Sequence, residues 1–146
     1  MTNYEYNYDY LNNYSDEQLV ELVKEMADFE EVSEAFLIID ERNSELAFKL
    51  GKDIYVNNKA DDYLQATVWD VMYYACSKKA IEILTERDIP LGKVLFGDIV
   101  NNLNVFKDEI NEKVIDFLKK SYDSYSNDIQ NNLKEGFKEL LVSNKN

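Results

Sequence analysis

Residues 61–86 constrain the fold more than any other stretch, because their apolar side chains recur at helical spacing in two successive segments. A short polar turn, Cys76-Ser77-Lys78, separates the segments, and Trp69 in the first is the single tryptophan. The apolar positions of the two segments are Leu64, Val68, Val71, Met72 and Ala75, then Ala80, Ile81 and Leu84. This pattern predicts two helices joined as a hairpin.

Composition agrees with a helical chain. Of 146 residues only 1 is Pro and 4 are Gly, too few for the many tight turns of an all-β protein. Hydrophobic residues make up 45% against 31% charged, which is typical of a globular protein rather than a disordered one.

No run approaches the roughly 18 apolar residues of a membrane span. The N-terminus has no signal-peptide pattern, so we expect a cytoplasmic protein. A single Cys excludes an internal disulfide, and we interpret Cys76 as a buried apolar residue.

Capping residues predict where other helices begin. Ser15 and Gln18 form a capping box, Ser44 is expected to cap another helix, and a residue of 61–62 caps the hairpin. Pro90 is expected at a first helical position. Further helices are expected at about 32–41, 91–103, 105–121 and 128–142, with the last capping the end of the domain.

An internal repeat near 34 residues organises these helices. A shift of 34 aligns 44–50 with 78–84 and 112–118, and the aligned columns are apolar. These columns are 46/80/114, 47/81/115 and 50/84/118, and, in the preceding helices, 35/69/103, 37/71/105 and 38/72/106. We predict an all-α fold: a short right-handed solenoid of about three antiparallel helix pairs. The copies lack the tetratricopeptide signature, so HEAT- or armadillo-like describes them better, and a plain four-helix bundle is the alternative.

The first 14 residues hold five of the 11 tyrosines, and we divide the chain into a Tyr-rich arm at 1–14 and one helical repeat domain at 15–146. Tyr4, Tyr6, Tyr8 and Tyr10 alternate with polar residues, but no second convincing strand exists to pair with them. Two interpretations stay open: an arm that contacts a partner, and a frayed terminus.

Negative charge is concentrated at the N-terminal end. The net charge is −13, of which residues 1–62 contribute −11 and the remainder −2. One helix face carries an acidic ridge, Glu17, Glu21, Glu25 and Asp28, whose like charges repel. Such a field opposes binding to nucleic acid or an anionic membrane and attracts basic proteins. A need for solubility would by itself also explain the negative net charge.

Catalytic and metal-binding chemistry have little support. The chain has no His, which removes the commonest general base and most zinc sites. Residues 123–128 resemble a calcium loop but lack its central Gly and terminal Glu. We therefore predict no enzymatic activity, no cofactor and no metal. A carboxylate-dependent metal-binding or hydrolytic protein is a third, weaker hypothesis.

Residues 34–55, EAFLIIDERNSELAFKLGKDIY, and the segment from Asp61-Asp62-Tyr63-Leu64-Gln65-Ala66 onward resemble small HEAT-like immunity proteins of bacterial polymorphic toxin systems, of the contact-dependent inhibition type. The resemblance covers about 31–90. It implies a cytosolic antidote that binds and blocks the C-terminal domain of one cognate toxin. Many such domains are nucleases with basic clefts, which an acidic surface can occupy. A general helical-repeat scaffold or adaptor is the alternative function.

We expect the contact surface to combine acidic residues of the N-terminal helices with two tyrosines as anchors. Each carboxylate taken singly could equally be a solvated surface residue. The candidate toxin-binding residues are Tyr8, Tyr10, Glu30, Glu31, Glu34, Asp40, Glu41, Glu45, Asp53, Asp61 and Asp62.

Overall fold

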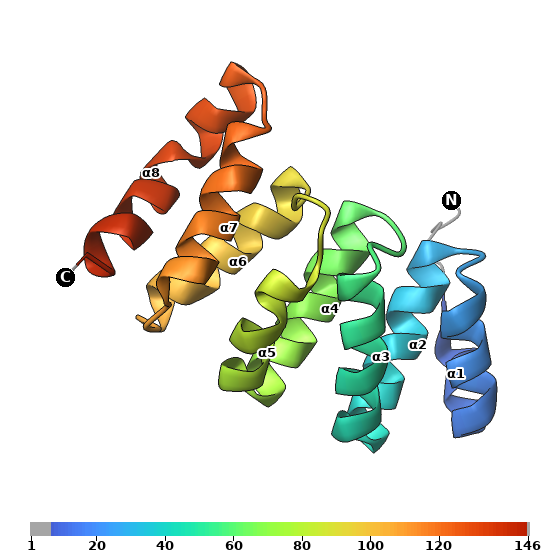
Figure 1. Ribbon diagram of the computed structural model, residues 1–146. Coiled ribbons are helices and arrows are strands. Elements are labelled where there is room, and N and C mark those ends of the chain that lie inside the picture. Colours follow the sequence, from blue (N-terminus) through green and yellow to red (C-terminus); the bar gives the residue numbers. More distant parts are fainter. Residues whose placement is uncertain (1–6, 146) are drawn as a thin grey trace.

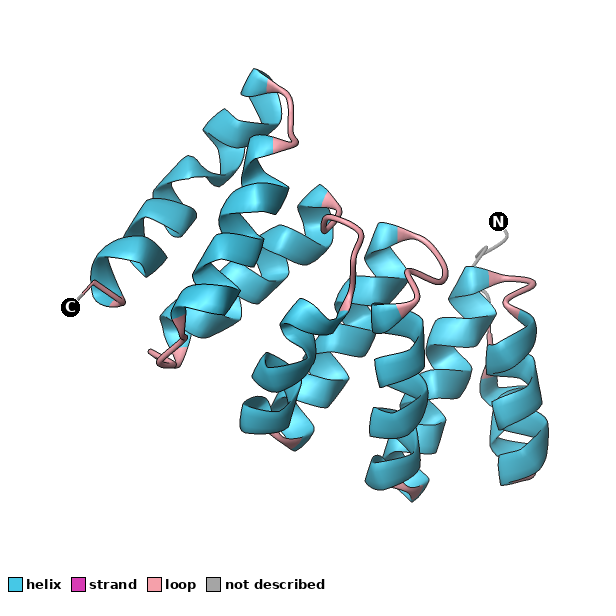
Figure 2. Cartoon of the chain, in the orientation of Figure 1, coloured by secondary structure: helices cyan, strands magenta, loops and turns pink. Residues whose placement is uncertain are grey.

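The structure, a computed structural model, describes residues 7–145, and all regular secondary structure within that range is helical (Figure 2). The prediction of an all-α protein is confirmed. Two 3-10 helices accompany the α-helices: η1 (Asp9–Asn13) near the N-terminus and η2 (Leu84–Glu86) after α5. The α-helices are α1 (Asp16–Glu25), α2 (Phe29–Arg42), α3 (Ser44–Val56), α4 (Asp62–Ala75), α5 (Ser77–Ile83), α6 (Lys93–Val105), α7 (Glu112–Asp123) and α8 (Asn127–Ser143).

The helices stand side by side in two layers (Figure 1). One layer is α2, α4, α6 and α8, in which each helix contacts the next. In the other layer α3 packs on α2 and α4, α5 packs on α4, and α7 contacts η2 and α8. Figure 1 shows the connections alternating between the two edges of the row, so the even-numbered helices all end at the same edge.

Aromatic side chains fill the space between the layers. Trp69 of α4 has no exposed surface, stacks on Tyr73 with ring centroids 5.5 Å apart, and lies 6.5 Å from Tyr55 of α3. Towards the C-terminus Phe96 of α6 meets Phe137 of α8 at 5.3 Å. The buried apolar residues form one continuous cluster from Leu11 to Leu140, so the core runs the length of the row.

Several predicted helix boundaries are confirmed and others are wrong. The capping box of Ser15 and Gln18 is present, and Asp61 caps α4. Asn43, not Ser44, caps α3, because the Asn43 side chain accepts the Leu46 backbone N–H. Pro90 does not open a helix: it lies in the loop before Gly92, the N-cap of α6. The expected helix 105–121 is really α7, preceded by a loop at 106–111.

The 34-residue repeat predicts burial in some columns and fails in others. Columns 35/69/103 and 50/84/118 are buried in every copy. In column 37/71/105, however, Leu37 and Val105 are exposed, and Phe106 is exposed in the next column. The reason is that helix spacing is uneven: α4 begins at Asp62 but α6 already at Lys93, so residues 105 and 106 fall at the end of α6 rather than inside it.

A buried arginine joins the two halves of the row. Arg87 is only 3% exposed, and its guanidinium lies over the Tyr55 ring at 5.0 Å from the centroid. It donates hydrogen bonds to five acceptors in four segments: α3, the α3–α4 loop, α4 and the segment before α6. These acceptors are the backbone oxygens of Tyr55 (3.1 Å), Ile89 (2.8 Å) and Pro90 (3.1 Å), and the side-chain oxygens of Gln65 (2.9 Å) and Asn58 (3.1 Å). Burial lowers the pKa of Arg87, but its partners are neutral dipoles that stabilise the cation.

We expect Arg87→Met to lower the free energy of unfolding by about 3 kcal/mol, because it leaves the buried acceptors without donors while keeping most of the apolar volume. Urea unfolding followed by Trp69 fluorescence measures this. The matched control is Lys113→Met, which removes an exposed cation on α7 and should cost about 0.5 kcal/mol or less. An Arg87 variant as stable as the Lys113 variant would contradict the assignment.

Candidate protein-binding surface

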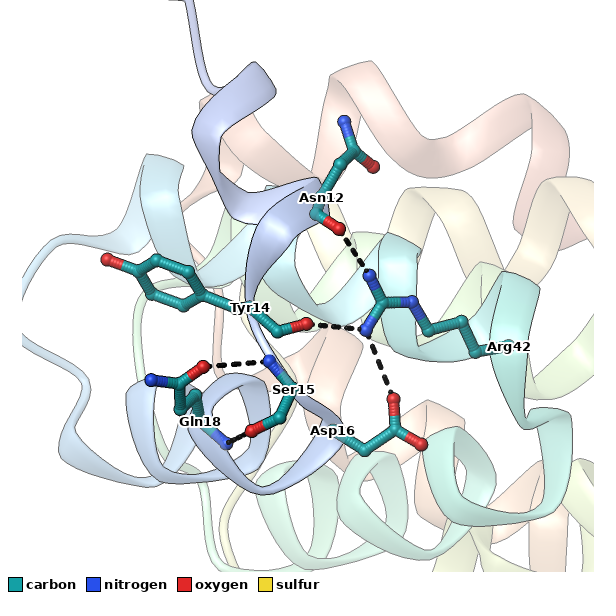
Figure 3. A network of polar contacts seen from close by, with 6 residues as sticks. All are labelled: Asn12, Tyr14, Ser15, Asp16, Gln18 and Arg42. Atoms are coloured by element: carbon teal, nitrogen blue, oxygen red, sulfur yellow. Dashed lines mark hydrogen bonds and ion pairs between the residues drawn. The ribbon is translucent and has the colours of Figure 1, made fainter.

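The described part of the N-terminal arm is folded against α2. Leu11 of η1 is fully buried in the core. Arg42 at the end of α2 reaches back to the arm and donates to the backbone oxygens of Asn12 and Tyr14, each at 2.8 Å, and to Asp16 Oδ1 at 3.1 Å (Figure 3). One buried side chain and one arginine thus fix residues 9–16.

This anchoring gathers three tyrosines on the surface of α2. The Tyr10 ring lies 6.3 Å from that of Tyr8 and 5.9 Å from that of Tyr14. Two hydroxyls point at the first turn of α2: Tyr8 donates to Glu30 Oε2 at 3.1 Å, and Tyr10 donates to Glu31. The hydrogen bond to the Glu31 carboxylate raises the pKa of Tyr10 to about 12.

Four of the predicted contact residues are therefore brought together: Tyr8, Tyr10, Glu30 and Glu31. We call this group the tyrosine–glutamate cluster. The other tyrosines of the predicted alternation, Tyr4 and Tyr6, lie outside the described residues. Tyr10 is 42% exposed, so the cluster presents an aromatic edge beside carboxylates to solvent.

Three further candidates extend the acidic surface. Glu34 and Glu41 lie on α2, Glu45 opens α3, and all three are exposed. Next to them, Glu17, Glu21 and other α1 side chains line an open groove of about 620 Å³. Glu17, Glu21 and Glu25 of the predicted acidic ridge thus share this groove on α1. The prediction is wrong for Asp28, which lies beyond the end of α1 and caps α2 by accepting the Glu30 backbone N–H.

The candidates Asp53, Asp61 and Asp62 already have partners within the fold. Asp53 forms an ion pair with Lys59 at 2.7 Å and accepts from Asn57, and the hydrogen bond from Lys59 lowers the pKa of Asp53. Asp61 accepts the Leu64 backbone N–H at 2.8 Å as the N-cap of α4.

Asp62 caps a helix other than its own. Its carboxylate accepts the backbone N–H groups of Val94 at 2.6 Å and Leu95 at 3.0 Å, which are unpaired donors in the first turn of α6. A Cβ on Gly92 would lie 2.4 Å from this carboxyl group, so the close approach requires glycine there. Asp62 thus ties α4 to α6, a role that its sequence position did not predict.

The last candidate, Asp40, is half-buried near the end of α2, and burial raises the pKa of its carboxyl group. It lines a groove of about 380 Å³ together with Ser44, Asp70 and Tyr74. Asp40 thus lies towards the opposite end of α2 from the tyrosine–glutamate cluster.

The negative surface is not uniform. The cleft between α3 and α5, about 610 Å³, is lined by Lys49, Lys52 and Lys79 along with Glu45. Cys76 lies in this cleft and is half-buried rather than fully buried as expected. The negative net charge of the chain therefore conceals a basic strip between α3 and α5.

Sequence reasoning missed a carboxyl pair between α4 and α6. Asp70 Oδ1 accepts from Asn102 Nδ2 at 2.9 Å. Across from it, Asp98 Oδ2 is buried without a hydrogen-bond partner. Burial, followed by the hydrogen bond and charge of Asp70, raises the pKa of Asp98 to about 7. No local pattern could reveal this pair, because its members lie on different helices.

Comparisons with protein families, curated proteins and solved structures find no match to this chain. Over residues 7–145, no group of three or more Cys, Asp or Glu side chains is placed to hold a metal ion. In the same range no helix has the length and apolar character needed to cross a bilayer.

We expect the stability of the chain to fall between pH 4 and pH 7 on account of Asp98. The folded chain holds the Asp98 proton up to about pH 7, whereas the unfolded chain releases it near the ordinary pKa of 3.8. Asp98→Asn should therefore raise the free energy of unfolding at pH 8 by about 1–2 kcal/mol, allowing for solvent screening of a half-exposed group.

The same substitution should change little at pH 3, where the carboxyl group is largely protonated in both the folded and the unfolded chain. Denaturant unfolding at the two pH values measures the difference. Asp116→Asn, on the exposed face of α7, serves as the control and should show no such dependence on pH. Equal effects of Asp98→Asn at both pH values would contradict the raised pKa of the Asp98 carboxyl group.

Proposed function

We propose that this chain is an immunity protein, which binds the C-terminal domain of one cognate bacterial toxin in the cytoplasm and blocks it. In this proposal the row of helices is a short right-handed solenoid of antiparallel pairs, HEAT- or armadillo-like, and works by occupying a protein rather than by transforming a substrate. Two features support it: the resemblance over 31–90, and the surface around the tyrosine–glutamate cluster.

The single observation that carries the proposal is the ordered arrangement of that cluster. Tyr8 and Tyr10 are held against α2 by the buried Leu11 and by the hydrogen bonds of Arg42 to the neighbouring backbone. Because the rings are positioned before binding, little conformational entropy is lost when a partner covers them. Tyrosines with fixed geometry are common anchors of protein interfaces.

The surrounding charge suits a basic partner. Residues 1–62 carry a net charge of −11, and the exposed carboxylates of Glu34 and Glu41 lie on the same helix as Glu30 and Glu31 of the cluster. Opposite charges accelerate association, whereas the buried aromatic contacts mainly slow dissociation. A nuclease domain with a phosphate-binding cleft has the required positive surface.

The gene immediately upstream is inspected first, because a toxin gene there favours the immunity function over the scaffold alternative. The decisive experiment is then co-expression of the chain with that toxin. If the proposal is correct, the chain restores growth and co-purifies with the toxin's C-terminal domain. A chain that does neither, while remaining folded by circular dichroism, is not the immunity protein of that toxin, and the scaffold alternative would take its place.

We expect Glu34→Lys, Glu41→Lys and Glu45→Lys together to slow association with the toxin domain about tenfold or more at low salt, with a smaller effect at high salt. Stopped-flow or biolayer kinetics measures the rate constants. The matched control reverses three exposed carboxylates nearer the C-terminus, Asp116, Glu135 and Glu139, with the same change in net charge. Equal slowing in both variants would indicate a general charge effect rather than a local surface.

A further inference from the structure

The edge of the row where α4 and α6 end carries an exposed aromatic patch. Tyr74 is 66% exposed, Val105 62% and Phe106 53%. The rings of Tyr74 and Phe106 meet edge to face, with centroids 6.0 Å apart. We call these three residues the α4–α6 patch. Large apolar side chains gathered on a surface are typical of contact sites, because leaving them in water is unfavourable.

Side chains and backbone groups beneath the surface hold the α4–α6 patch in place. The Phe106 ring lies 5.7 Å from that of the buried Tyr73, whose hydroxyl donates to Asp108 in the following loop. The backbone N–H of Phe106 donates to Asn102 at 3.1 Å, and that of Asp108 donates to Leu103 at 3.1 Å. The loop after α6 is thereby fixed against α4, and the rings are presented in a defined position.

Carboxylates surround the patch. Asp70 precedes Tyr74 by one turn of α4, and both line the groove of about 380 Å³ that extends to Asp40 of α2. Asp98 of α6 lies opposite Asp70. Asp98, Asn102 and Phe106 are spaced four residues apart, so they lie on the same side of α6. Across residues 7–145, none of the ion pairs includes these aspartates or Asp108.

The basic residue adjoining the patch in sequence is Lys107, which directly follows Phe106. Negative charge is therefore in excess, with the aspartates at 40, 70 and 108 set against Lys107, and Asp98 adds a further charge above about pH 7. Aromatic faces attract a guanidinium or ammonium group, and carboxylates accept its hydrogen bonds. The chemistry that both features share is recognition of a cation carried on an apolar stem.

We propose that the α4–α6 patch and its aspartates dock an arginine-bearing apolar segment of the toxin domain, as a second contact region towards the other edge of the row from the tyrosine–glutamate cluster. This inference rests on the proposed function. A second copy of the chain fits less well, because dimerisation through the patch would bring like carboxylates together on chains of net charge −13.

The test measures the dissociation constant for the catalytically inactivated C-terminal domain of the upstream-encoded toxin. Tyr74→Ser combined with Phe106→Ser should weaken binding at least about 30-fold, since both rings are lost from the contact. The control is Tyr63→Ser combined with Val142→Ser, which removes side chains that are 70% and 64% exposed at other places on the surface. It should change affinity less than about threefold.

Asp98→Asn provides a variant whose effect cannot come from unfolding, because it should stabilise the chain at pH 8. At that pH it should weaken binding about fivefold or more by removing a negative charge next to Asp70, which lines the groove. Both results together support the docking surface.

Three outcomes overturn it in distinguishable ways. If the wild-type chain binds and the Tyr74/Phe106 variant binds equally well, the inference fails and the immunity function stands. If the folded wild-type chain does not bind the toxin domain, both proposals fail. If sedimentation shows a wild-type dimer that the Tyr74/Phe106 substitutions dissociate, the occupant of the patch is a second copy.

Discussion

The packing of α3, α4 and the loop before α6 depends on one buried cation. Arg87 brings a full charge into the interior without a carboxylate in contact, and five neutral oxygens replace its hydration. Those oxygens come from the end of α3, the α3–α4 loop, α4 and the segment that leads to α6. If the spacing between any two of these segments changed, the buried guanidinium would lose hydrogen-bond acceptors. The arginine therefore favours one relative placement of the helices over similar alternatives.

A second constraint acts between the same helices. Asp62 caps the first turn of α6, and Gly92 leaves space for its carboxyl group. Along this part of the row, polar contacts between helices are therefore as specific as the apolar ones. This explains how a core of similar leucines and isoleucines can adopt one register: the apolar side chains favour compaction, whereas Arg87 and Asp62 select the arrangement.

Several local features were predicted correctly from the sequence, although the cap expected at Ser44 and the helix start expected at Pro90 were not. Contacts between residues far apart in the sequence were predicted less well. Helical periodicity over 61–86, the capping box at Ser15 and the cap at Asp61 depend on residues a few positions apart, and all are confirmed. The exposure of Val105 and Phe106 was mispredicted, because an average repeat of 34 conceals unequal steps between helices. At the candidate surface, neither the contact of Tyr8 and Tyr10 with Glu30 and Glu31 nor the Asp70–Asp98 pair has a sequence signal. Each joins residues whose separation is fixed only after the helices pack.

The carboxyl pair has a consequence for how the chain would respond to acidity. A protein without histidine lacks the side chain that ordinarily titrates near neutral pH, and Asp98, with a pKa of about 7, takes that place. A cation arriving beside Asp98 would expel the proton, so association and deprotonation are thermodynamically linked. Alkalinity would then strengthen the complex while weakening the uncomplexed fold. The affinity for the cation and the free energy of unfolding would therefore change in opposite directions as the pH rises through the neutral range, because both depend on the same proton.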